Sequence, residues 1–387
     1  MRQTLAILGS TGSIGVQTLD FVRENPELFE VVTLTAHRNW ELLARQAAEF
    51  DVDSVVIADK SFYQPLKEAL SNTDIKVFAG YDAVVQSVAN SNISVVVNAL
   101  VGYSGMLPTL RAVQCGKKVA LANKESLVVG GELIMRTALE NGAPITPIDS
   151  EHSAIFQCLA GEASPLHRII ITCSGGAFRD VPREELATKS VEEALKHPQW
   201  NMGAKITVDS ATLVNKGFEV IEAHWLFGVE ADRISVILHP QSIVHSLVEF
   251  EDGALKAQLG LPDMHIPISY ALMYPKRAVR SVGERFSFAD HPALTFAEVD
   301  RVKYPALDIA YDCLRRGGTA ACTMNGANDI AVAAFLDHRC AYPDIVGAIE
   351  YSLSKSNFSQ SPTVEDLALA NDEARSLAVE YLKSKHA

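Results

Sequence analysis

Residues 4–15 of the chain read TLAILGSTGSIG, an apolar run that leads directly into a glycine-rich turn. The run Thr4–Leu8 predicts a buried strand, and Val16, Leu19 and Val22 continue the chain at helical spacing. A strand, a glycine turn and a helix in this order form a phosphate cradle, because bare backbone amides and a helix N-terminus face the anion. The spacing is G-x-x-G-x-x-G and not the G-x-G-x-x-G of common NAD enzymes, so a plain tight turn is the alternative.

The second predicted strand, Val31–Thr35, ends in Ala36-His37-Arg38-Asn39. At this point an NAD enzyme carries an acid that holds the ribose hydroxyls. This chain instead offers a guanidinium, which suits a 2′-phosphate. We therefore expect NADPH as the cofactor, with an ordinary surface arginine as the other interpretation of Arg38.

Strand-like and helix-like runs then alternate as far as residue 148. The strand-like runs are Ser54–Ala58, Ile75–Phe78, Ile93–Leu100, Lys118–Leu121 and Ala143–Ile148. This rhythm predicts a mostly parallel, doubly wound sheet. Ligands of such sheets bind at the carboxyl ends of the strands, where Asn123-Lys124-Glu125-Ser126 follows one run. Lys124 is therefore a predicted substrate or cofactor contact, while Glu125 could equally be a first-turn helix charge.

Residues 147–152 read PIDSEH and place two carboxylates, Asp149 and Glu151, at the end of the last of these strands. Side by side and without partners, two carboxylates repel and one must stay protonated. A hard divalent cation removes that conflict, because carboxylate oxygens are its preferred ligands. The alternative is an N-cap, in which Asp149 or Ser150 satisfies the first amides of the next helix.

Past this point the pattern changes. Residues 173–178, CSGGAF, follow a predicted strand and form a glycine-rich loop suited to an oxyanion. A buried thiol is the simpler interpretation of Cys173, although a nucleophile is conceivable. Pro182–Lys196 predicts an amphipathic helix. The segment 197–203, HPQWNMG, has neither period and is interpreted either as a lid or as a packed connecting loop.

The run Thr207–Phe227 has the strongest helical pattern in the chain. One side of this predicted helix carries Asn215, Lys216, Glu219 and Glu222, three or four residues apart and therefore adjacent in space. Asp209 and Ser210 stand at its predicted start, where hydroxyls and amides can take a phosphate. Gly217 costs about 1 kcal/mol relative to alanine inside a helix, which predicts close approach of another group to that face.

The remaining residues predict supporting structure. Glu251-Asp252-Gly253 predicts a hairpin between two strand-like runs, and His239 before it is interpreted as structural. Residues 277–304 have little periodicity and resemble a linker, and residues 305–387 are helical in pattern.

Composition excludes several classes of function. The 387 residues include 34 basic and 47 acidic side chains, a net charge of −13, which argues against nucleic acid or an anionic membrane as the main partner. The six cysteines form no CxxC pair, so free thiols in a reducing, cytoplasmic setting are expected. No apolar run reaches membrane-spanning length and no targeting segment is recognised.

Taken in order, these motifs resemble the 1-deoxy-D-xylulose 5-phosphate reductoisomerase family. The resemblance rests on Gly9–Gly15, 123–126, 149–152, 174–176, 197–205, 208–219, 239–242, 261–264 and 325–330. It implies an α/β fold with an N-terminal Rossmann-like doubly wound sheet, an α/β catalytic domain and a C-terminal helical domain. Departures are a short loop between Phe156 and Arg168, and Ala36-His37-Arg38 where the family often has glycine and lysine.

The resemblance implies NADPH- and metal-dependent rearrangement and reduction of 1-deoxy-D-xylulose 5-phosphate to 2-C-methyl-D-erythritol 4-phosphate, a step toward isoprenoid precursors. It implies that Mg²⁺ or Mn²⁺ is held by Asp149, Glu151 and Glu219. The implied catalytic residues are these three with Lys124 and His197. The implied substrate contacts are Lys124, Ser150, Glu151, Ser174, His197, Trp200, Met202, Ser210, Asn215, Lys216 and Glu219. The implied cofactor contacts are Thr11, Gly12, Ser13, Ile14, Ala36, His37, Arg38, Asn39, Asn123, Glu125 and Gly203.

Pattern and resemblance together predict an NADPH-binding domain at 1–149 and a catalytic domain at 150–276, with a flap around 197–203. A linker at 277–304 and a helical domain at 305–387 complete the division, and a homodimer is usual in the family. A metal-independent dehydrogenase that uses a cysteine or histidine would keep its turnover on chelation. An NADPH-sensing regulator would bind the cofactor without turnover.

Overall fold

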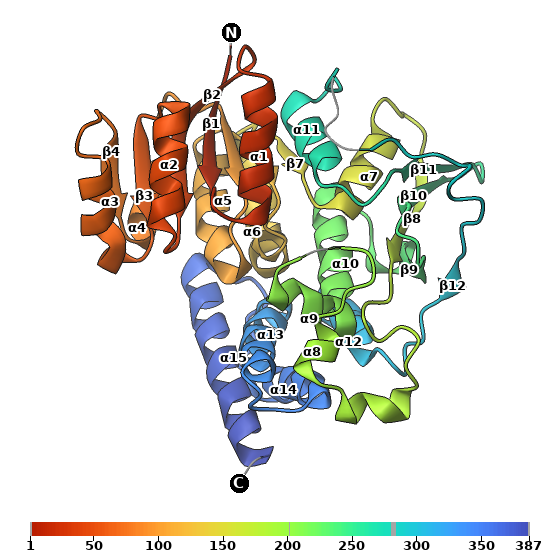
Figure 1. The fold of residues 1–387 in the computed structure, drawn as a ribbon. Coiled ribbons are helices and arrows are strands. Elements are labelled where there is room, and N and C mark those ends of the chain that lie inside the picture. The colour runs from red at the N-terminus through yellow and green to blue at the C-terminus, as the bar shows by residue number, and fades with distance from the viewer. Residues whose placement is uncertain (1, 201, 280–283, 386–387) are drawn as a thin grey trace. The chain divides into compact units, whose positions relative to one another are not determined.

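The computed structural model describes residues 2–200, 202–279 and 284–385, which form two compact units (Figure 1). The N-terminal unit comprises residues 2–126, 132–153 and 263–279. The C-terminal unit comprises residues 127–131, 154–200, 202–262 and 284–385. The boundary falls inside helix α7 (Ser150–Leu159), whose first turn belongs to one unit and whose later turns belong to the other.

A seven-stranded parallel sheet forms the middle of the N-terminal unit, in the order β4-β3-β2-β1-β5-β6-β7. Its strands are β1 Gln3–Leu8, β2 Phe29–Ala36, β3 Ser54–Ile57, β4 Lys76–Ala79, β5 Val95–Asn98, β6 Lys118–Leu121 and β7 Ile145–Pro147. The predicted doubly wound sheet is confirmed. The strand order reverses between β1 and β5, and this switch point is where open α/β sheets bind ligands.

The helices of this unit are α1 Ser13–Glu24, α2 Trp40–Phe50, α3 Tyr63–Ala69, α4 Tyr81–Ser87, α5 Met106–Gln114, α6 Glu125–Glu140 and α11 His265–Met273. Residues 127–131 of α6 are grouped with the C-terminal unit. Helix α11 comes from far along the chain, yet its Ile268 and Leu272 are fully buried in the same core as Leu5 and Ile7. Gln3 Nε2 also donates to the Leu272 carbonyl oxygen at 3.2 Å. The domain boundaries at residues 150 and 277, which the sequence predicts, stay a prediction.

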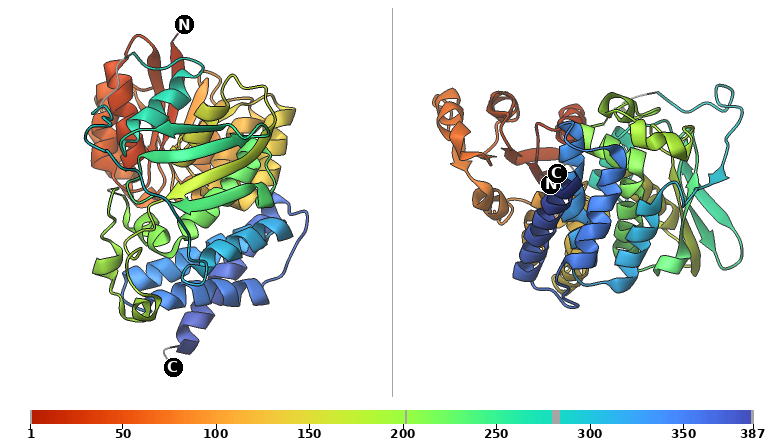
Figure 2. Two further views of the ribbon diagram at one scale, coloured as in Figure 1. Left: turned by 90° about the vertical axis from the view of Figure 1, so that its right-hand side faces the viewer. Right: turned by 90° about the horizontal axis from the view of Figure 1, so that it is seen from below.

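The C-terminal unit contains a five-stranded mixed sheet in the order β11-β10-β8-β9-β12 (Figure 2). Its strands are β8 Leu166–Cys173, β9 Ile234–Leu238, β10 Val244–Phe250, β11 Leu255–Leu259 and β12 Ala297–Glu298. Strands β8 and β9 are parallel and every other pair is antiparallel. The hairpin predicted at Glu251-Asp252-Gly253 is the β10–β11 connection.

Helices make up the rest of this unit. They are α8 Val191–Ala194, α9 Ala204–Thr212, α10 Val214–Phe227, α12 Pro305–Arg316, α13 Ala320–Leu336, α14 Tyr342–Lys355 and α15 Val364–Lys385. Helix α13 is buried along most of its length and packs against both α14 and α15 (Figure 1). The helical C-terminal segment predicted from residue 305 is confirmed.

The predicted single helix over Thr207–Phe227 is wrong. Leu213 adopts φ +58° and ψ 16°, a left-handed conformation that interrupts the chain between α9 and α10. Leucine carries no turn signal, and tertiary packing holds it there, since its side chain is 1% exposed. The Thr212 hydroxyl accepts the Val214 amide at 3.3 Å and so supports the break.

The predicted amphipathic helix over Pro182–Lys196 is also divided. A 3₁₀ segment at Arg183–Thr188 ends where Lys189 becomes extended, and α8 starts one residue beyond Ser190. Ser190 and Glu193 form a reciprocal capping box, in which each side chain accepts the other's backbone amide. A strong N-cap signal inside the apolar pattern therefore starts a new helix.

Gly217 is explained by packing between helices. A Cβ on this residue would lie 2.5 Å from Ala310 Cβ of α12. The close approach that the sequence predicts is thus made by a helix and not by a ligand.

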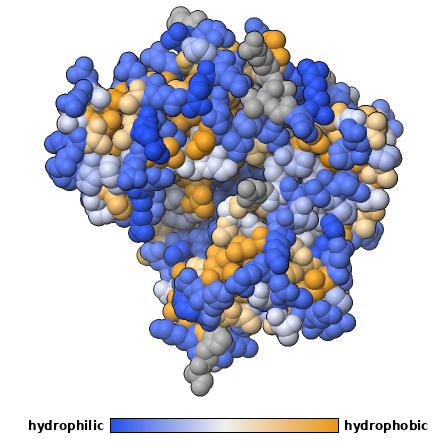
Figure 3. All heavy atoms as spheres, in the orientation of Figure 1, coloured by the Kyte–Doolittle hydropathy of each residue, from blue (hydrophilic) through white to orange (hydrophobic). Residues whose placement is uncertain are grey.

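The face of the molecule in Figure 3 is mostly hydrophilic, in keeping with a chain in which 21% of residues are charged. Among the helices described, none combines the length and the apolar character needed to cross a membrane.

Candidate active site

The glycine turn after β1 places the N-terminus of α1 at the switch point of the parallel sheet. A Cβ on Gly15 would lie 2.3 Å from the Gly9 carbonyl oxygen, and Gly9 itself has φ +79°, so the turn can only be this tight with glycine at both positions. Gly12 precedes the helix and contributes no side-chain cap, and Gly12 and Ser13 are exposed. An uncapped helix N-terminus bordered by glycine suits a phosphate group.

The end of β2 supplies the residues predicted to contact the ribose side of the cofactor. Asn39 caps α2 by accepting the Leu42 amide at 3.2 Å. Arg38 Nε donates to Asp59 Oδ2 at 3.0 Å, and Asp59 lies just beyond β3. Two bonds from Ser61, one from its amide and one from its hydroxyl, hold the other oxygen of Asp59 and lower the pKa of that carboxyl. The guanidinium is thus held at one edge by a fixed carboxylate.

Asn123 connects the loops that follow β5 and β6. Its Nδ2 donates to the carbonyl oxygens of Leu100 and Gly102, each at 3.0 Å, and to Glu125 Oε2. Its Oδ1 accepts the Ser126 amide at 2.9 Å. Any contact of Asn123 with a cofactor would therefore run through its backbone, because the side chain is already committed.

Asp149 and Lys124 meet at the carboxyl ends of β6 and β7. Lys124 Nζ lies 3.0 Å from Asp149 Oδ2, and the lysine side chain is 8% exposed. His152 Nδ1 lies 3.2 Å from the same oxygen. Burial alone would raise the pKa of Asp149, but the Lys124 charge and the His152 hydrogen bond outweigh it and hold that pKa well below its ordinary value. Asp149 is therefore a carboxylate with one strongly held oxygen.

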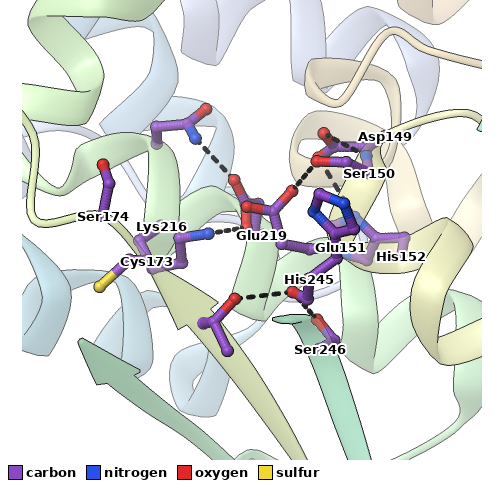
Figure 4. Close-up of polar contacts among 12 residues, drawn as sticks. Asp149, Ser150, Glu151, His152, Cys173, Ser174, Lys216, Glu219, His245 and Ser246 are labelled. Atoms are coloured by element: carbon purple, nitrogen blue, oxygen red, sulfur yellow. Dashed lines mark hydrogen bonds and ion pairs between the residues drawn. The ribbon is translucent and has the colours of Figure 1, made fainter. Parts of the chain in front are cut away.

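Ser150 and Glu151 begin α7 beside this pair. The Ser150 hydroxyl donates to the Glu151 carboxylate (Figure 4). The Ser150 amide donates to Asp149 Oδ1 at 3.1 Å, so Asp149 performs part of the capping that the sequence offered as an alternative.

The break at Leu213 creates a helix N-terminus in the middle of the residues predicted to bind phosphate. Ser210 lies in the last turn of α9, not at a helix start as predicted, while Asn215 and Lys216 lie in the first turn of α10. Leu213 provides no side-chain cap. Residues with hydroxyl, amide and ammonium side chains therefore stand on both sides of the start of α10, where the Thr212 hydroxyl accepts the Val214 amide, and a helix start with this composition suits an anion.

Glu219 lies one turn further along α10 and is 1% exposed. Lys216 Nζ donates to its Oε2 at 2.5 Å (Figure 4), and Asn215 Nδ2 donates to its Oε1 at 2.6 Å. A buried carboxylate stays ionised only where such partners replace water. The predicted metal ligand is thus joined directly to two predicted phosphate ligands.

The glycine loop after β8 closes on this region. A Cβ on Gly176 would lie 2.6 Å from the Ser210 carbonyl oxygen, so the loop packs directly on the end of α9. Ser174 Oγ accepts the Gly176 amide at 3.2 Å and lies 3.1 Å from His197 Nε2. His197 Nδ1 accepts the Trp200 amide at 2.9 Å, which leaves the proton on Nε2, directed at Ser174. Cys173 is buried, as the thiol interpretation expects.

The segment 197–203 has no regular secondary structure at the residues described. The Trp200 ring lies 6.2 Å from the His245 ring between centroids, and Trp200 and Met202 are half-buried. Gly203 is exposed. Asn201, inside the predicted flap, lies outside the described residues.

Comparison with known proteins assigns the family. The family models of 1-deoxy-D-xylulose 5-phosphate reductoisomerase match residues 5–131, and those of its C-terminal domains match residues 145–227 and 259–377. A 1-deoxy-D-xylulose 5-phosphate reductoisomerase of Bacteroides fragilis is 50% identical over 382 residues, 98% of each chain. The chain belongs to the 1-deoxy-D-xylulose 5-phosphate reductoisomerase family. The resemblance stated from the motifs is confirmed.

Other members of the family agree over similar lengths. The Chlorobaculum tepidum enzyme of the same name is 46% identical over 97% of this chain and 98% of its own. A solved structure of the Zymomonas mobilis reductoisomerase with NADPH has a TM-score of 0.92 at 40% identity, covering 99% of this chain and 100% of that one. A reductoisomerase solved with NADPH, fosmidomycin and magnesium has a TM-score of 0.94 at 36% identity, covering 98% of both chains. These matches confirm the predicted fold class.

Two features near the site were not found from the sequence. The first is Asp59, because the partner of Arg38 follows the third strand, whereas the acid of an NAD enzyme is expected after the second. The second is a group of charged and amide side chains around Asp209, which was expected at a helix start and instead lies buried inside α9. Only the packing of α9 on α13 brings that group together.

Proposed function

We propose that this chain converts 1-deoxy-D-xylulose 5-phosphate into 2-C-methyl-D-erythritol 4-phosphate with NADPH and a divalent cation, in the non-mevalonate route to isoprenoid precursors. This is the activity of the family to which the chain belongs. The observation that carries the proposal is the match over 98% of both lengths to an enzyme of that name. One solved relative is a complex with NADPH and another is a complex with NADPH, fosmidomycin and magnesium, which supports the choice of both cofactors.

Asp149, Glu151 and Glu219 would hold the cation. All three offer carboxylate oxygens, a donor set that suits Mg²⁺ or Mn²⁺ and not zinc. When bound, the cation would polarise the substrate carbonyl and orient it with the adjacent hydroxyl. Mg²⁺ and Mn²⁺ both fit this set of ligands.

Ser174, Ser210, Asn215 and Lys216 would bind the substrate phosphate. The position of Asn215 and Lys216 in the first turn of α10 and the loop packed on Ser210 support this assignment. Lys216 and Asn215 also hold Glu219, so a bound phosphate and the metal ligand would share the same two donors. Binding energy from this remote group can be used to position the reacting carbons.

Lys124, Ser150 and His197 would contact other parts of the substrate. The His197 proton on Nε2 gives a neutral donor whose orientation is set by the Trp200 amide on the other ring nitrogen. Trp200 and Met202 would cover the substrate when the flap closes and so exclude water from the reaction.

The residues proposed for NADPH begin at the glycine turn. Thr11, Gly12, Ser13 and Ile14 would face its pyrophosphate, as the uncapped start of α1 supports. Ala36, His37, Arg38 and Asn39 would surround the 2′-phosphate, and Asn123, Glu125 and Gly203 would lie nearer the nicotinamide. Reduction requires the nicotinamide and the residues that bind the substrate phosphate to contact the same substrate molecule.

A cytoplasmic homodimer completes the proposal. Support comes from strand β12, an edge strand of only two residues, both exposed, with Phe296 beside it at 47% exposure and Phe288 at 69%. Exposed aromatic side chains along a short sheet edge fit a protein interface. The functional segments 1–149, 150–276, 277–304 and 305–387 are part of the same proposal.

The test is consumption of NADPH in the presence of 1-deoxy-D-xylulose 5-phosphate and Mg²⁺, with the product identified. Turnover should stop on chelation and return when Mg²⁺ or Mn²⁺ is restored. Turnover that persists with chelator would favour a metal-independent dehydrogenase. Cofactor binding with no turnover under any metal would favour a regulator.

A further inference from the structure

A group of buried polar side chains surrounds Asp209, the residue next to Ser210, which is one of the proposed phosphate ligands. Asp209 of α9 is 3% exposed, and each of its carboxylate oxygens has a partner from a different place. Asn328 Nδ2 of α13 donates to Oδ1 at 2.7 Å, and Lys205 Nζ, one turn earlier in α9, donates to Oδ2 at 2.9 Å. The carboxylate therefore joins its own helix to α13.

The group continues into α15. Lys205 Nζ also lies 3.3 Å from Asp329 Oδ1, and Arg375 Nη1 lies 3.5 Å from the second oxygen of Asp329. Two cations and two carboxylates thus balance in charge across three helices. Asp329 is 16% exposed and Lys205 22%, so the pair between them is screened less than a surface pair, whereas Arg375 is 42% exposed.

This group holds the helix that bears a proposed phosphate ligand. Helix α9 begins directly after the flap residue Gly203 and carries Ser210 next to Asp209. On its other side, Gly176 of the glycine loop leaves no room for even a Cβ against the Ser210 carbonyl. Helix α9 is nine residues long, and no side chain caps its start. Its position must therefore come from tertiary contacts.

We propose that Asn328 and Lys205 are positioning residues for the reaction. Through Asp209 they fix α9, and α9 sets Ser210 and the start of α10 at the distance that the substrate phosphate requires. This inference rests on the proposed function, because it takes Ser210, Asn215 and Lys216 as the phosphate ligands.

Stability alone is a poor explanation for this group. Its neighbours in α9, Val208 and Ala211, belong to a large apolar cluster in which a hydrophobic side chain at 209 would pack well. A buried ion pair generally offers no more stability than such packing, since desolvation offsets the attraction. Unlike apolar contacts, hydrogen bonds and ion pairs are directional, so they fix the position of one helix along another.

The Asn328 side chain points to the same conclusion. Asn328 is fully buried, and its Oδ1 has no hydrogen-bond partner among the residues described. An unsatisfied buried oxygen is costly, whereas the same amide turned over would place an oxygen against the Asp209 carboxylate. Asn328 therefore occupies this position for the bond that its Nδ2 donates.

The test compares Asn328→Ala with the wild-type full chain. We expect KM for 1-deoxy-D-xylulose 5-phosphate and the inhibition constant of inorganic phosphate to rise about tenfold, the effect of losing one hydrogen bond to a charged group. KM for NADPH should stay within about twofold of the wild-type value, because the substitution removes no hydrogen bond at the proposed cofactor site.

Ser352→Ala is the matched control. Ser352 is fully buried in α14, and its hydroxyl donates to the Ala348 carbonyl oxygen at 2.8 Å, far along the chain from the phosphate ligands. It should lower the melting temperature without changing phosphate inhibition. Lys205→Arg should keep near wild-type phosphate inhibition, while Lys205→Met should weaken it. If Asn328→Ala does not fold, the two Lys205 variants still test the proposal.

The outcomes separate the two levels of inference. If the wild type does not turn over the substrate, the proposed function fails. If it does, and Asn328→Ala and Lys205→Met change only the melting temperature, as Ser352→Ala does, the group is purely structural and the positioning role is refuted.

Discussion

Glu219 shows at the scale of one residue how a charge can be buried without being lost. Its carboxylate is removed from water, and Lys216 and Asn215 replace the water on both oxygens. Removing one partner of such a pair leaves an uncompensated buried charge. The same two donors lie at the start of α10, so the proposed anion binding, the buried carboxylate and the helix geometry are coupled within the five residues 215–219.

We predict that Glu219→Gln loses turnover by more than about 100-fold while NADPH binding survives, because a metal ligand contributes at least as much as the outer-shell groups that support it. Glutamine is nearly as good a helix former as glutamate, but Lys216 would lose its ion-pair partner, so the melting temperature should fall as well. The measurements are steady-state kinetics, cofactor titration and thermal unfolding. Near wild-type turnover would remove Glu219 from the metal site.

Arg38, which we propose to recognise the 2′-phosphate of NADPH, belongs to the same scale. Because the Arg38 side chain is exposed, its ion pair with Asp59 adds little to stability. The main effect of the pair is to orient the guanidinium. We predict that Arg38→Ala reduces the preference for NADPH over NADH by about tenfold or more, as one lost charged hydrogen bond implies.

The measurement for Arg38→Ala is the ratio of kcat/KM values with the two cofactors. Arg23→Ala is the control, since Arg23 is a half-exposed arginine of the same unit that is paired with Asp20 and Glu49. An unchanged ratio in Arg38→Ala, or an equal change in Arg23→Ala, would mean that Arg38 does not recognise the 2′-phosphate.

At the scale of elements, packing decides what local preference leaves open. Propensity alone predicts that Gly217→Ala stabilises α10 by about 1 kcal/mol. The new Cβ would instead lie 2.5 Å from Ala310 Cβ, and overpacking typically costs about 1–3 kcal/mol. We therefore predict a lower free energy of unfolding, measured by denaturant titration. Ala310→Gly in the same chain should restore part of the loss, and a stabilised single variant would contradict the packing argument.

The flap has no regular secondary structure at the residues described. Its contacts include the bonds of His197 to Ser174 and to the Gln199 and Trp200 amides, and the Trp200 ring lies near His245. We predict that chymotrypsin cuts after Trp200 in the free enzyme, and that substrate analogue with metal suppresses this cut. Trp200→Ala should bind NADPH almost normally and lose efficiency with the substrate. Equal resistance to protease in both states would favour a packed connecting loop.

The strands were predictable because buried parallel strands appear as short, nearly continuous apolar runs. The proximity of Lys124 and Asp149 was predictable, since both follow strands at one edge of the sheet. The break at Leu213 was not, because a buried leucine in a left-handed conformation is imposed by tertiary packing. Because of that break, a helix starts at Val214 as well as before Thr207, and the proposed anion site lies at the Val214 start.

At the scale of the whole molecule, the segment that carries β12 presents two exposed phenylalanines, Phe288 and Phe296. His239 anchors it: the ring accepts the Ile243 and Val244 amides at Nε2, donates to the Thr295 carbonyl oxygen from Nδ1 at 2.9 Å, and stacks on Phe296. Burial lowers the pKa of His239, which keeps the ring neutral and able to accept both amides. The histidine interpreted as structural thus fixes the backbone beside an open sheet edge.

We predict that this edge belongs to the homodimer interface. Phe288 is 69% exposed and packs edge-on against the Phe286 ring, with no need for that exposure in a monomer. The wild type should therefore have about twice the 42.0 kDa chain mass in solution, and Phe288→Asp should shift it toward the monomer at low concentration. Leu139→Asp is the control, because Leu139 is 85% exposed but lies in α6 of the N-terminal unit. Light scattering across a dilution series measures both. A wild type that is monomeric throughout would remove the dimer, and dissociation by Leu139→Asp alone would place the interface on the other unit.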